Sequence, residues 1–141
     1  MKYMILSYGS QRDYDGLTGN ATGDYAWTPA DFTAMVEFMQ TFTAKLEASG
    51  ELVDTRGLVA PVHTRRVSGS TRAGTPVLVT DGPYAETQEV LAGYWIVECD
   101  SFDRATEIAA GLAECPGPTA VAARAYADVR PVAEGPEGPE M

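Results

Sequence analysis

The sequence predicts an α+β domain in which two helices cover one face of an antiparallel sheet. Two segments repeat apolar residues at three- and four-residue steps, as amphipathic helices do, and the segments between them resemble short strands. Hydrophobic residues make up 45% of the 141 residues, which suffices for one core. We therefore expect one domain at 1–131, followed by a disordered tail at 132–141, where Glu, Gly and Pro recur.

The first part of the chain predicts a strand, a long connection and a helix. Residues 2–8 are apolar on both alternating faces, which is typical of a central strand. Residues 9–27 are rich in Gly, Asp, Asn and Thr and predict a connection without secondary structure. A helix is predicted at 28–49, because Thr28 can act as its N-cap and Asp31 stands at the third helical position. Its apolar stripe is Phe32, Met35, Val36, Met39, Phe42 and Leu46.

The rest of the chain predicts a hairpin, three further strands and a second helix. Glycines at 69 and 74 separate the two short runs of the hairpin. The last strand is indicated by apolar side chains that alternate with polar ones. The predicted ranges are 51–59 for the second strand, 62–68 and 76–80 for the hairpin, 90–99 for the next strand, 101–114 for the helix and 121–131 for the last strand.

Without the hairpin, the predicted order is β-α-β-β-α-β, which is typical of the ferredoxin-like fold. The helices can cover only one face of such a sheet. The other face is expected to carry polar and aromatic side chains of the second and last strands, namely Asp54, Arg56, Arg124, Tyr126, Asp128 and Arg130. Two such faces that pack together form a dimeric α/β barrel with a pocket between the sheets. We therefore expect a homodimer, with a small-molecule ligand in that pocket.

Composition excludes several classes of partner. The formal net charge is −10, from 20 acidic and 10 basic residues, which argues against binding to nucleic acid. Arg65, Arg66 and Arg72 form the one basic cluster, and a solvated surface explains it. The N-terminus begins directly with a strand-like run, without a signal sequence, and no apolar run approaches about 18 residues. We therefore expect a cytoplasmic protein without a membrane partner.

Metal and cofactor chemistry also find no support in the sequence. His63 is the only histidine, and Cys99 and Cys115 lie far apart without a C-x-x-C spacing, so neither a transition-metal site nor a disulfide is predicted. The chain has no G-x-G-x-x-G, P-loop or G-x-S-x-G motif. No cofactor is therefore predicted.

The most distinctive segment is Asp81-Gly82-Pro83-Tyr84-Ala85-Glu86-Thr87-Gln88-Glu89. A turn explains its first three residues together, because Asp81 can accept hydrogen bonds from its own turn, Gly82 permits a reversal and proline fixes the exit direction. The alternative is that Asp81 or Glu86 acts as a general base in a partly desolvated pocket, with Tyr84 as a hydrogen-bond donor.

His63 allows two interpretations as well. A lone histidine beside Arg65 and Arg66 on a hairpin fits an exposed surface residue. It also fits a general base near neutral pH, paired with Asp81 or Asp54. The predicted catalytic residues are thus Asp81, His63, Tyr84 and Glu86, and the predicted substrate-binding residues are Arg124, Tyr126, Arg130, Arg56 and Tyr94.

The segment DGPYAETQE, followed by Leu91-Ala92-Gly93-Tyr94-Trp95, resembles the signature of the DGPF branch of the YCII-related proteins. The opening MKYMILSYG and the closing Val129-Arg130-Pro131 match as well, so the resemblance covers about residues 1–132. It implies a bacterial, dimeric α/β barrel of ferredoxin-like subunits, in a branch without a settled reaction. Tyr84 replaces the usual phenylalanine, and Gln88 replaces the usual lysine. The helix at 28–49 has no histidine, so the catalytic histidine–aspartate pair proposed for shorter relatives cannot be carried over.

Three functions stay open from the sequence. The first is an acid/base enzyme of the isomerase, cyclase or lyase type that uses no metal or nucleotide. The second is a non-catalytic ligand-sensing or regulatory protein, since DGPF proteins are often encoded beside extracytoplasmic-function sigma factors. The third is that residues 81–89 only shape the fold.

Overall fold

The computed structural model describes residues 1–20, 22–82 and 84–135. Its strands and helices, in chain order, are β1 (Lys2–Gly9), α1 (Gln11–Leu17), α2 (Pro29–Ser49), β2 (Leu52–Gly57), β3 (Arg65–Ser68), β4 (Leu78–Asp81), β5 (Val90–Glu98), α3 (Phe102–Ala110), α4 (Thr119–Arg124) and β6 (Ala127–Pro131). Short 3₁₀ turns lie at Gly23–Tyr25, Pro61–His63 and Gly111–Glu114.

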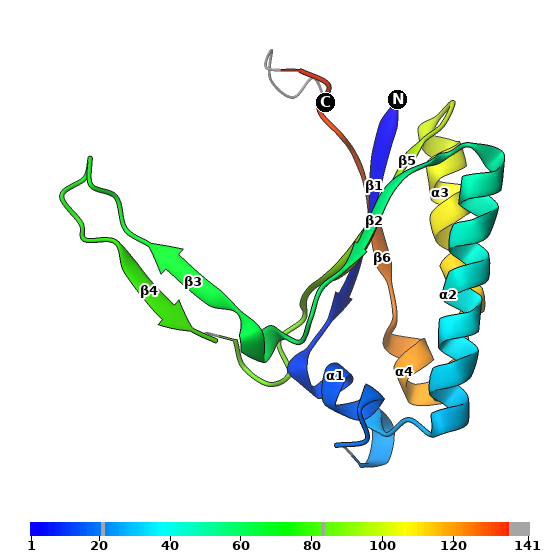
Figure 1. The fold of residues 1–141 in the computed structure, drawn as a ribbon, viewed down its shortest axis with the longest axis horizontal. Helices are drawn as coiled ribbons and strands as arrows, with labels where there is room; N and C mark the ends of the chain where they lie inside the picture. The colour runs from blue at the N-terminus through cyan, green and yellow to red at the C-terminus, as the bar shows by residue number, and fades with distance from the viewer. Residues whose placement is uncertain (21, 83, 136–141) are drawn as a thin grey trace.

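The described residues form a four-stranded sheet with strand order β2-β5-β1-β6, in which every neighbouring pair is antiparallel. Helices α2 and α3 lie on the same side of this sheet, and no helix of the described residues covers its other side (Figure 1). Once the β3–β4 hairpin and the short helices are left out, this is the predicted β-α-β-β-α-β arrangement. The predicted α+β, ferredoxin-like fold is therefore confirmed.

The core lies between the sheet and the two long helices. Alternate residues of β1 and β5 point toward the helices, because side chains of a strand alternate between its two faces. Ile5 and Val97 are fully buried there, and the Trp95 indole meets the Phe42 ring edge-on at 5.4 Å between centroids. The helices contribute Leu46, Ala105 and Ile108 to the same cluster.

Helix α2 begins and ends as its sequence predicts. The Thr28 side chain accepts from the Asp31 amide, while the Asp31 carboxylate accepts from the Thr28 amide. At the other end Gly50 adopts the left-handed conformation, with φ of 78°. The predicted stripe is only partly buried, however, since Leu46 is its one buried member and Phe32 keeps 43% of its surface exposed.

The predicted unstructured connection at 9–27 is wrong. Residues 11–17 form α1, and residues 23–25 form a 3₁₀ turn. Ser10 and Asp13 make a reciprocal capping box that starts α1, and Gly16 packs so closely on the Tyr25 carbonyl that any side chain there would clash. Its seven residues, QRDYDGL, form no apolar stripe of the kind that predicts a helix from sequence.

The predicted last strand at 121–131 is wrong in its first half. Thr119–Arg124 forms α4, and β6 begins only at Ala127. The segment is rich in alanine, which is the best helix former, so alternation of alanine with polar residues is weak support for a strand. Arg124 consequently lies at the end of a helix rather than in the row of the last strand.

The hairpin is present, and Figure 1 shows it projecting from the body of the domain. At the C-terminal side of β6, the Val132 amide donates to the Lys2 carbonyl. Most of the predicted disordered tail, residues 136–141, lies outside the described residues. Among the described residues, no helix has the length and apolar character needed to cross a membrane.

Candidate functional site

The uncovered side of the sheet, here called the open face, has an apolar centre and charged edges. Residues that lie directly opposite each other on neighbouring antiparallel strands share a face. The strand register therefore gives two rows across the open face: Arg56–Tyr94–Leu6–Asp128 and Asp54–Ile96–Met4–Arg130. Each row carries an arginine at one edge and an aspartate at the other, and the order of the two charges is reversed between the rows.

A tyrosine–aspartate pair occupies the β2 edge of this face. The Tyr94 hydroxyl donates to Asp54 Oδ2 at 3.0 Å, and Asp54 Oδ1 lies 2.8 Å from the Arg56 guanidinium. The hydrogen bond to Asp54 raises the pKa of Tyr94, because ionisation would place two negative charges side by side. Tyr94 therefore stays a hydrogen-bond donor at neutral pH.

A second tyrosine–aspartate pair occupies the β6 edge. The Tyr8 hydroxyl donates to Asp128 Oδ2 at 2.8 Å, and the Tyr8 ring stacks on Tyr126 at 5.2 Å between centroids. The hydrogen bond to Asp128 raises the pKa of Tyr8, and loss of hydration raises that of Tyr126. Asp128 meets no arginine in an ion pair among the described residues, which distinguishes it from Asp54.

Tyr8 of this pair lines a small pocket of about 170 Å³. The pocket lies where the end of β1, the start of α1, the segment before β5 and helix α4 meet. It is lined by Tyr8, Ser10, Asp13, Tyr25, Thr87, Glu89, Val121, Arg124 and Ala125. It combines aromatic surface with both signs of charge, as small-molecule sites commonly do.

Two arginines stack on the Tyr25 ring beside this pocket. Arg124 lies 4.4 Å and Arg12 4.8 Å from the ring centroid. Arg124 also faces Asp13 at 3.8 Å, and Arg12 faces Glu86 at 3.2 Å. The Arg124–Asp13 distance is too long for a direct hydrogen bond, so the guanidinium keeps donors for another acceptor.

Comparison with known proteins identifies the family. The sequence model of the YCII-related domain matches residues 1–130. The chain belongs to the YCII-related family. It is also 30% identical over 90 residues to an uncharacterised protein of Rhizobium meliloti (strain 1021), a match that covers 62% of this chain and 68% of that protein. The predicted family is thus confirmed, while membership of the DGPF branch stays a prediction.

The YCII-related domain brings only part of the predicted site together. Arg124 lines the pocket, and Tyr126 stacks on Tyr8, which also lines it. Glu86 does not line the pocket but forms an ion pair with Arg12. Tyr94 and Arg56 lie together on the open face, at the β2 edge. Arg130 lies on that face at the β6 edge, opposite Met4.

The other predicted catalytic residues lie at the base of the hairpin. The Asp81 side chain is 92% exposed and faces Arg65 at 3.9 Å. Tyr84 lies beneath the Arg66 guanidinium, 5.5 Å from ring centroid to carbon, and His63 is exposed in the 3₁₀ turn before β3. None of these three lines the pocket, so the segment 81–89 reaches it through Thr87 and Glu89 instead.

Sequence reasoning missed Tyr8, Asp13, Tyr25, Thr87 and Glu89 as pocket residues. Tyr8 could have been found, because it continues the alternation of Met4 and Leu6 onto the open face. Asp13 could have been found through its capping box with Ser10. Tyr25 carried no such signal, because its place depends on how the 3₁₀ turn packs against α1 and α4.

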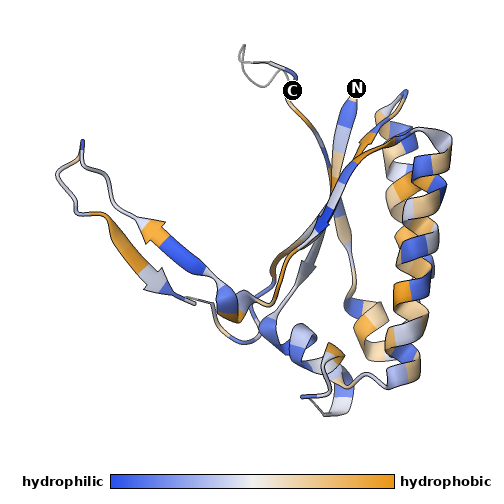
Figure 2. Ribbon diagram, in the orientation of Figure 1, coloured by the Kyte–Doolittle hydropathy of each residue, from blue (hydrophilic) through white to orange (hydrophobic). Residues whose placement is uncertain are grey.

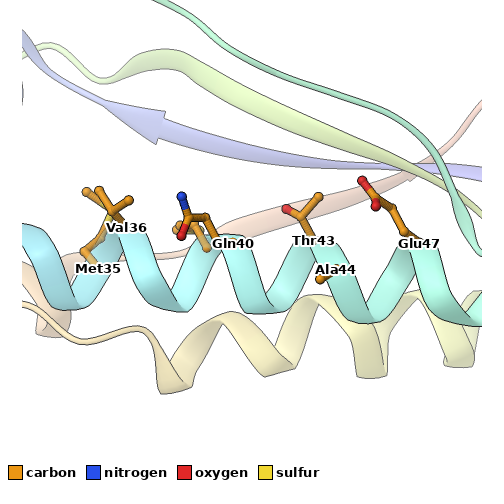
Figure 3. Close-up of a pocket in the computed structure, with 7 residues that line it drawn as sticks. Met35, Val36, Gln40, Thr43, Ala44 and Glu47 are labelled. Carbon is orange, nitrogen blue, oxygen red and sulfur yellow. The ribbon is translucent and has the colours of Figure 1, made fainter.

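A second, larger groove of about 420 Å³ runs along α2. Figure 3 shows Val36, Gln40, Thr43 and Glu47 projecting from the same side of that helix. Met35, Met39 and Ala44 complete the lining, which holds one carboxylate and no other ionisable group. It offers packing surface rather than acid/base chemistry. Among the described residues there is no cluster of three or more histidine, cysteine or acidic side chains fit to hold a metal ion.

Proposed function

We propose that this YCII-related protein is a homodimer that binds a small molecule at the margin of two open faces packed against each other. The observation that carries this proposal is the pair of charged rows on the open face. In the single chain the central side chains of these rows, Met4, Leu6 and Ile96, are only partly covered. A continuous apolar strip of this kind between charged edges is typical of an interface.

The charge pattern complements itself under two-fold symmetry. An axis parallel to the strands, midway between two facing sheets, places β2 of one subunit over β6 of the other. Arg56 then meets the partner's copy of Asp128, and Asp54 meets the partner's copy of Arg130. Opposite charges meet at both edges, and apolar side chains meet at the centre.

The pocket beside Tyr8 supplies the ligand site of this proposal. Arg124 can bind an acidic group, and the Tyr8 and Tyr25 rings can hold a flat apolar body. Glu89 and Asp13 also line the pocket and favour a ligand that carries a hydrogen-bond donor as well. We therefore propose small aromatic acids as the ligand class.

Acid/base catalysis is the second candidate, and the Tyr8–Asp128 pair favours it. Tyr8 lines the pocket and is protonated at neutral pH, and the Asp128 carboxylate that accepts its hydrogen bond can take up its proton, so the pair offers a proton relay to the pocket. Under this proposal Asp128 replaces Asp81 and His63 as the base. If the protein is instead a non-catalytic sensor, it binds its ligand in the same pocket and Asp128 has no role as a base.

The dimer is tested by analytical ultracentrifugation of the wild type and the Ile96→Glu variant. Because Ile96 lies at the centre of the face, two buried carboxylates should raise the dimer dissociation constant by at least about a hundredfold. Thr106→Glu, on the exposed surface of α3, is the matched control and should leave dimerisation unchanged. A wild-type protein that is monomeric at every concentration would refute the proposal.

Ligand binding is tested by titrating ¹⁵N-labelled protein with sodium benzoate, and with benzamide as the uncharged counterpart. Benzoate should shift the amide signals of residues that line the pocket, such as Ser10 and Glu89, more strongly than benzamide does. Arg124→Ala should abolish the difference between the two compounds, while Arg72→Ala, on the hairpin, should preserve it. Equal shifts from benzoate and benzamide in the wild type would reject an acidic ligand.

A further inference from the structure

The hairpin exposes an apolar surface that the other described residues do not cover. We call residues 64–82 the arm. Val67, Val77 and Val79 keep 66%, 57% and 61% of their surface exposed. Figure 2 shows the corresponding hydrophobic colour along β4 and at the end of β3. Among the described residues, no other strand or helix packs extensively against either strand of the arm.

The three valines share one face of the arm. Val67 lies opposite Val79 in the β3–β4 ladder, and Val77 lies two residues before Val79, just ahead of the first residue of β4. Arg65 and Asp81 close this face at its base. The opposite face carries Arg66, Ser68 and Thr80, with Leu78 as its apolar member.

The base of the arm is held firmly by the body of the domain. Pro61 is buried, the Val62 amide donates to Gln11 Oε1 at 2.8 Å, and the Tyr14 hydroxyl donates to the Leu58 carbonyl at 2.8 Å. Within the arm, the Gly82 amide donates to the Thr64 carbonyl at 2.8 Å. The direction of the arm is therefore set before any partner binds.

The tip of the arm is an ordered turn. Gly69 has φ of 106° and approaches the Pro76 carbonyl so closely that a side chain would clash. The Ser70 amide donates to Thr75 Oγ1 at 2.7 Å, and the Thr75 amide donates to the Ser70 carbonyl at 3.0 Å. The arm is thus a shaped element, although an isolated two-stranded hairpin is only marginally stable in water.

Charge points to the body of a second copy as the surface that covers the arm. The arm carries Arg65, Arg66 and Arg72 against the single carboxylate of Asp81, so it is basic, whereas the whole chain has a net charge of −10. The rest of the chain is therefore strongly acidic and attracts the arm. Figure 1 shows the arm on the side of the sheet opposite α2 and α3, which is where a subunit on the open face would lie.

We propose that the arm clasps the second subunit, with Val67, Val77 and Val79 packed on the partner's body. This inference rests on the homodimer proposed above and adds a second contact to it. From Thr64 to the tip the arm extends about 20 Å, at about 3.3 Å per residue, and facing sheets lie about 10 Å apart. The arm is therefore long enough to pass the partner's sheet and reach its helical layer.

Analytical ultracentrifugation of Val79→Glu and Thr80→Glu tests the clasp. The two variants place the same charge on neighbouring residues that point to opposite faces of the arm. Val79→Glu should raise the dimer dissociation constant by at least about tenfold, and Thr80→Glu should change it by less than about threefold. Equal effects of the two variants would contradict the assignment of the valine face.

Hydrogen exchange on the wild type tests the clasp without relying on a variant. The amides of the β3–β4 ladder should be protected above the dimer dissociation constant and should exchange rapidly below it, because the free arm is marginally stable. The amides of the β1–β5 ladder should stay protected at both concentrations. Arm protection that is independent of concentration would overturn the clasp.

The two proposals fail in different ways. If Ile96→Glu dissociates the dimer and Val79→Glu does not, the clasp is wrong and the open-face dimer stands. If Val79→Glu dissociates the dimer and Ile96→Glu does not, the arm is a dimer contact and the open-face proposal is wrong. A monomeric wild type rejects both.

Discussion

The two faces of one sheet differ sharply, although the same strands build them. On the face toward the helices, Ile5 and Val97 are fully buried and pack with aromatic and aliphatic neighbours. On the open face, their strand neighbours Leu6 and Ile96 stay partly covered and lie between charged edges. The alternation of each strand thus supplies a surface for folding on one side and, in our proposal, a surface for association on the other.

The largest expected effect is a difference in stability between substitutions at two neighbouring residues of β1, Ile5 and Leu6. Ile5→Ala should lower the free energy of unfolding by about 2–5 kcal/mol, because it leaves a cavity in a packed core. Leu6→Ala should lower it by no more than about 1 kcal/mol in the monomer, since its side chain is already partly hydrated. Urea unfolding in the Ile96→Glu background keeps dimerisation out of the comparison. Similar losses for the two variants would mean that the open face is part of the monomer's core.

How well the sequence predicted each region follows from what determines the structure there. The helix at 29–49 was predictable because Thr28, Asp31 and Gly50 are local signals with local causes. The sheet was predictable because alternation and turn residues define strands within a few positions. For the short helix α1, the capping box was the one local signal in the sequence. At 121–124 the sequence alternates like a strand, but because alanine suits a helix equally well, that alternation did not distinguish the two.

The candidate site was less predictable because contacts between distant segments create it. Tyr8 and Asp128 are 120 residues apart, and their hydrogen bond requires the register of β1 against β6. Arg124 was predicted on the last strand but lies at the end of α4. The catalytic alternatives for Asp81 and His63 required a pocket around these residues, yet their place depends on the direction of the arm, which no local pattern specifies.

An intermediate effect should separate the two tyrosine–aspartate pairs of the open face. Asp128→Asn and Asp54→Asn each remove a carboxylate that raises a tyrosine pKa, so both should move the phenolate absorbance curve to lower pH. Only Asp128→Asn should change benzoate binding, because Asp128 holds Tyr8, which lines the pocket, whereas Asp54 holds Tyr94, which does not. Spectrophotometric titration and the benzoate titration measure the two responses. If Asp54→Asn changes benzoate binding as much, the ligand occupies the centre of the open face instead.

The smallest effect is expected where helix α3 meets the sheet, at the ion pair between Glu51 and Arg104. Two guanidinium nitrogens each lie 2.9 Å from the Glu51 carboxylate, and they lower its pKa from 4.5 to about 2. Since the folded state keeps Glu51 charged more readily than the unfolded state does, the pair stabilises the fold above the unfolded pKa. That contribution is lost as the pH falls from about 4.5 to about 2.

Glu51→Gln should therefore lower the free energy of unfolding slightly at neutral pH, by the small amount usual for a surface ion pair. The difference from the wild type should shrink as the pH falls and vanish near pH 2, because protonated glutamate and glutamine are nearly equivalent there. Urea unfolding at a series of pH values measures it, with Glu107→Gln as the control that removes the more exposed partner of the same arginine. A difference in unfolding free energy that persists at pH 2 would assign the stabilisation to packing of the Glu51 side chain rather than to its charge. The edge of the covered face would then be stabilised by packing, as the core of that face is.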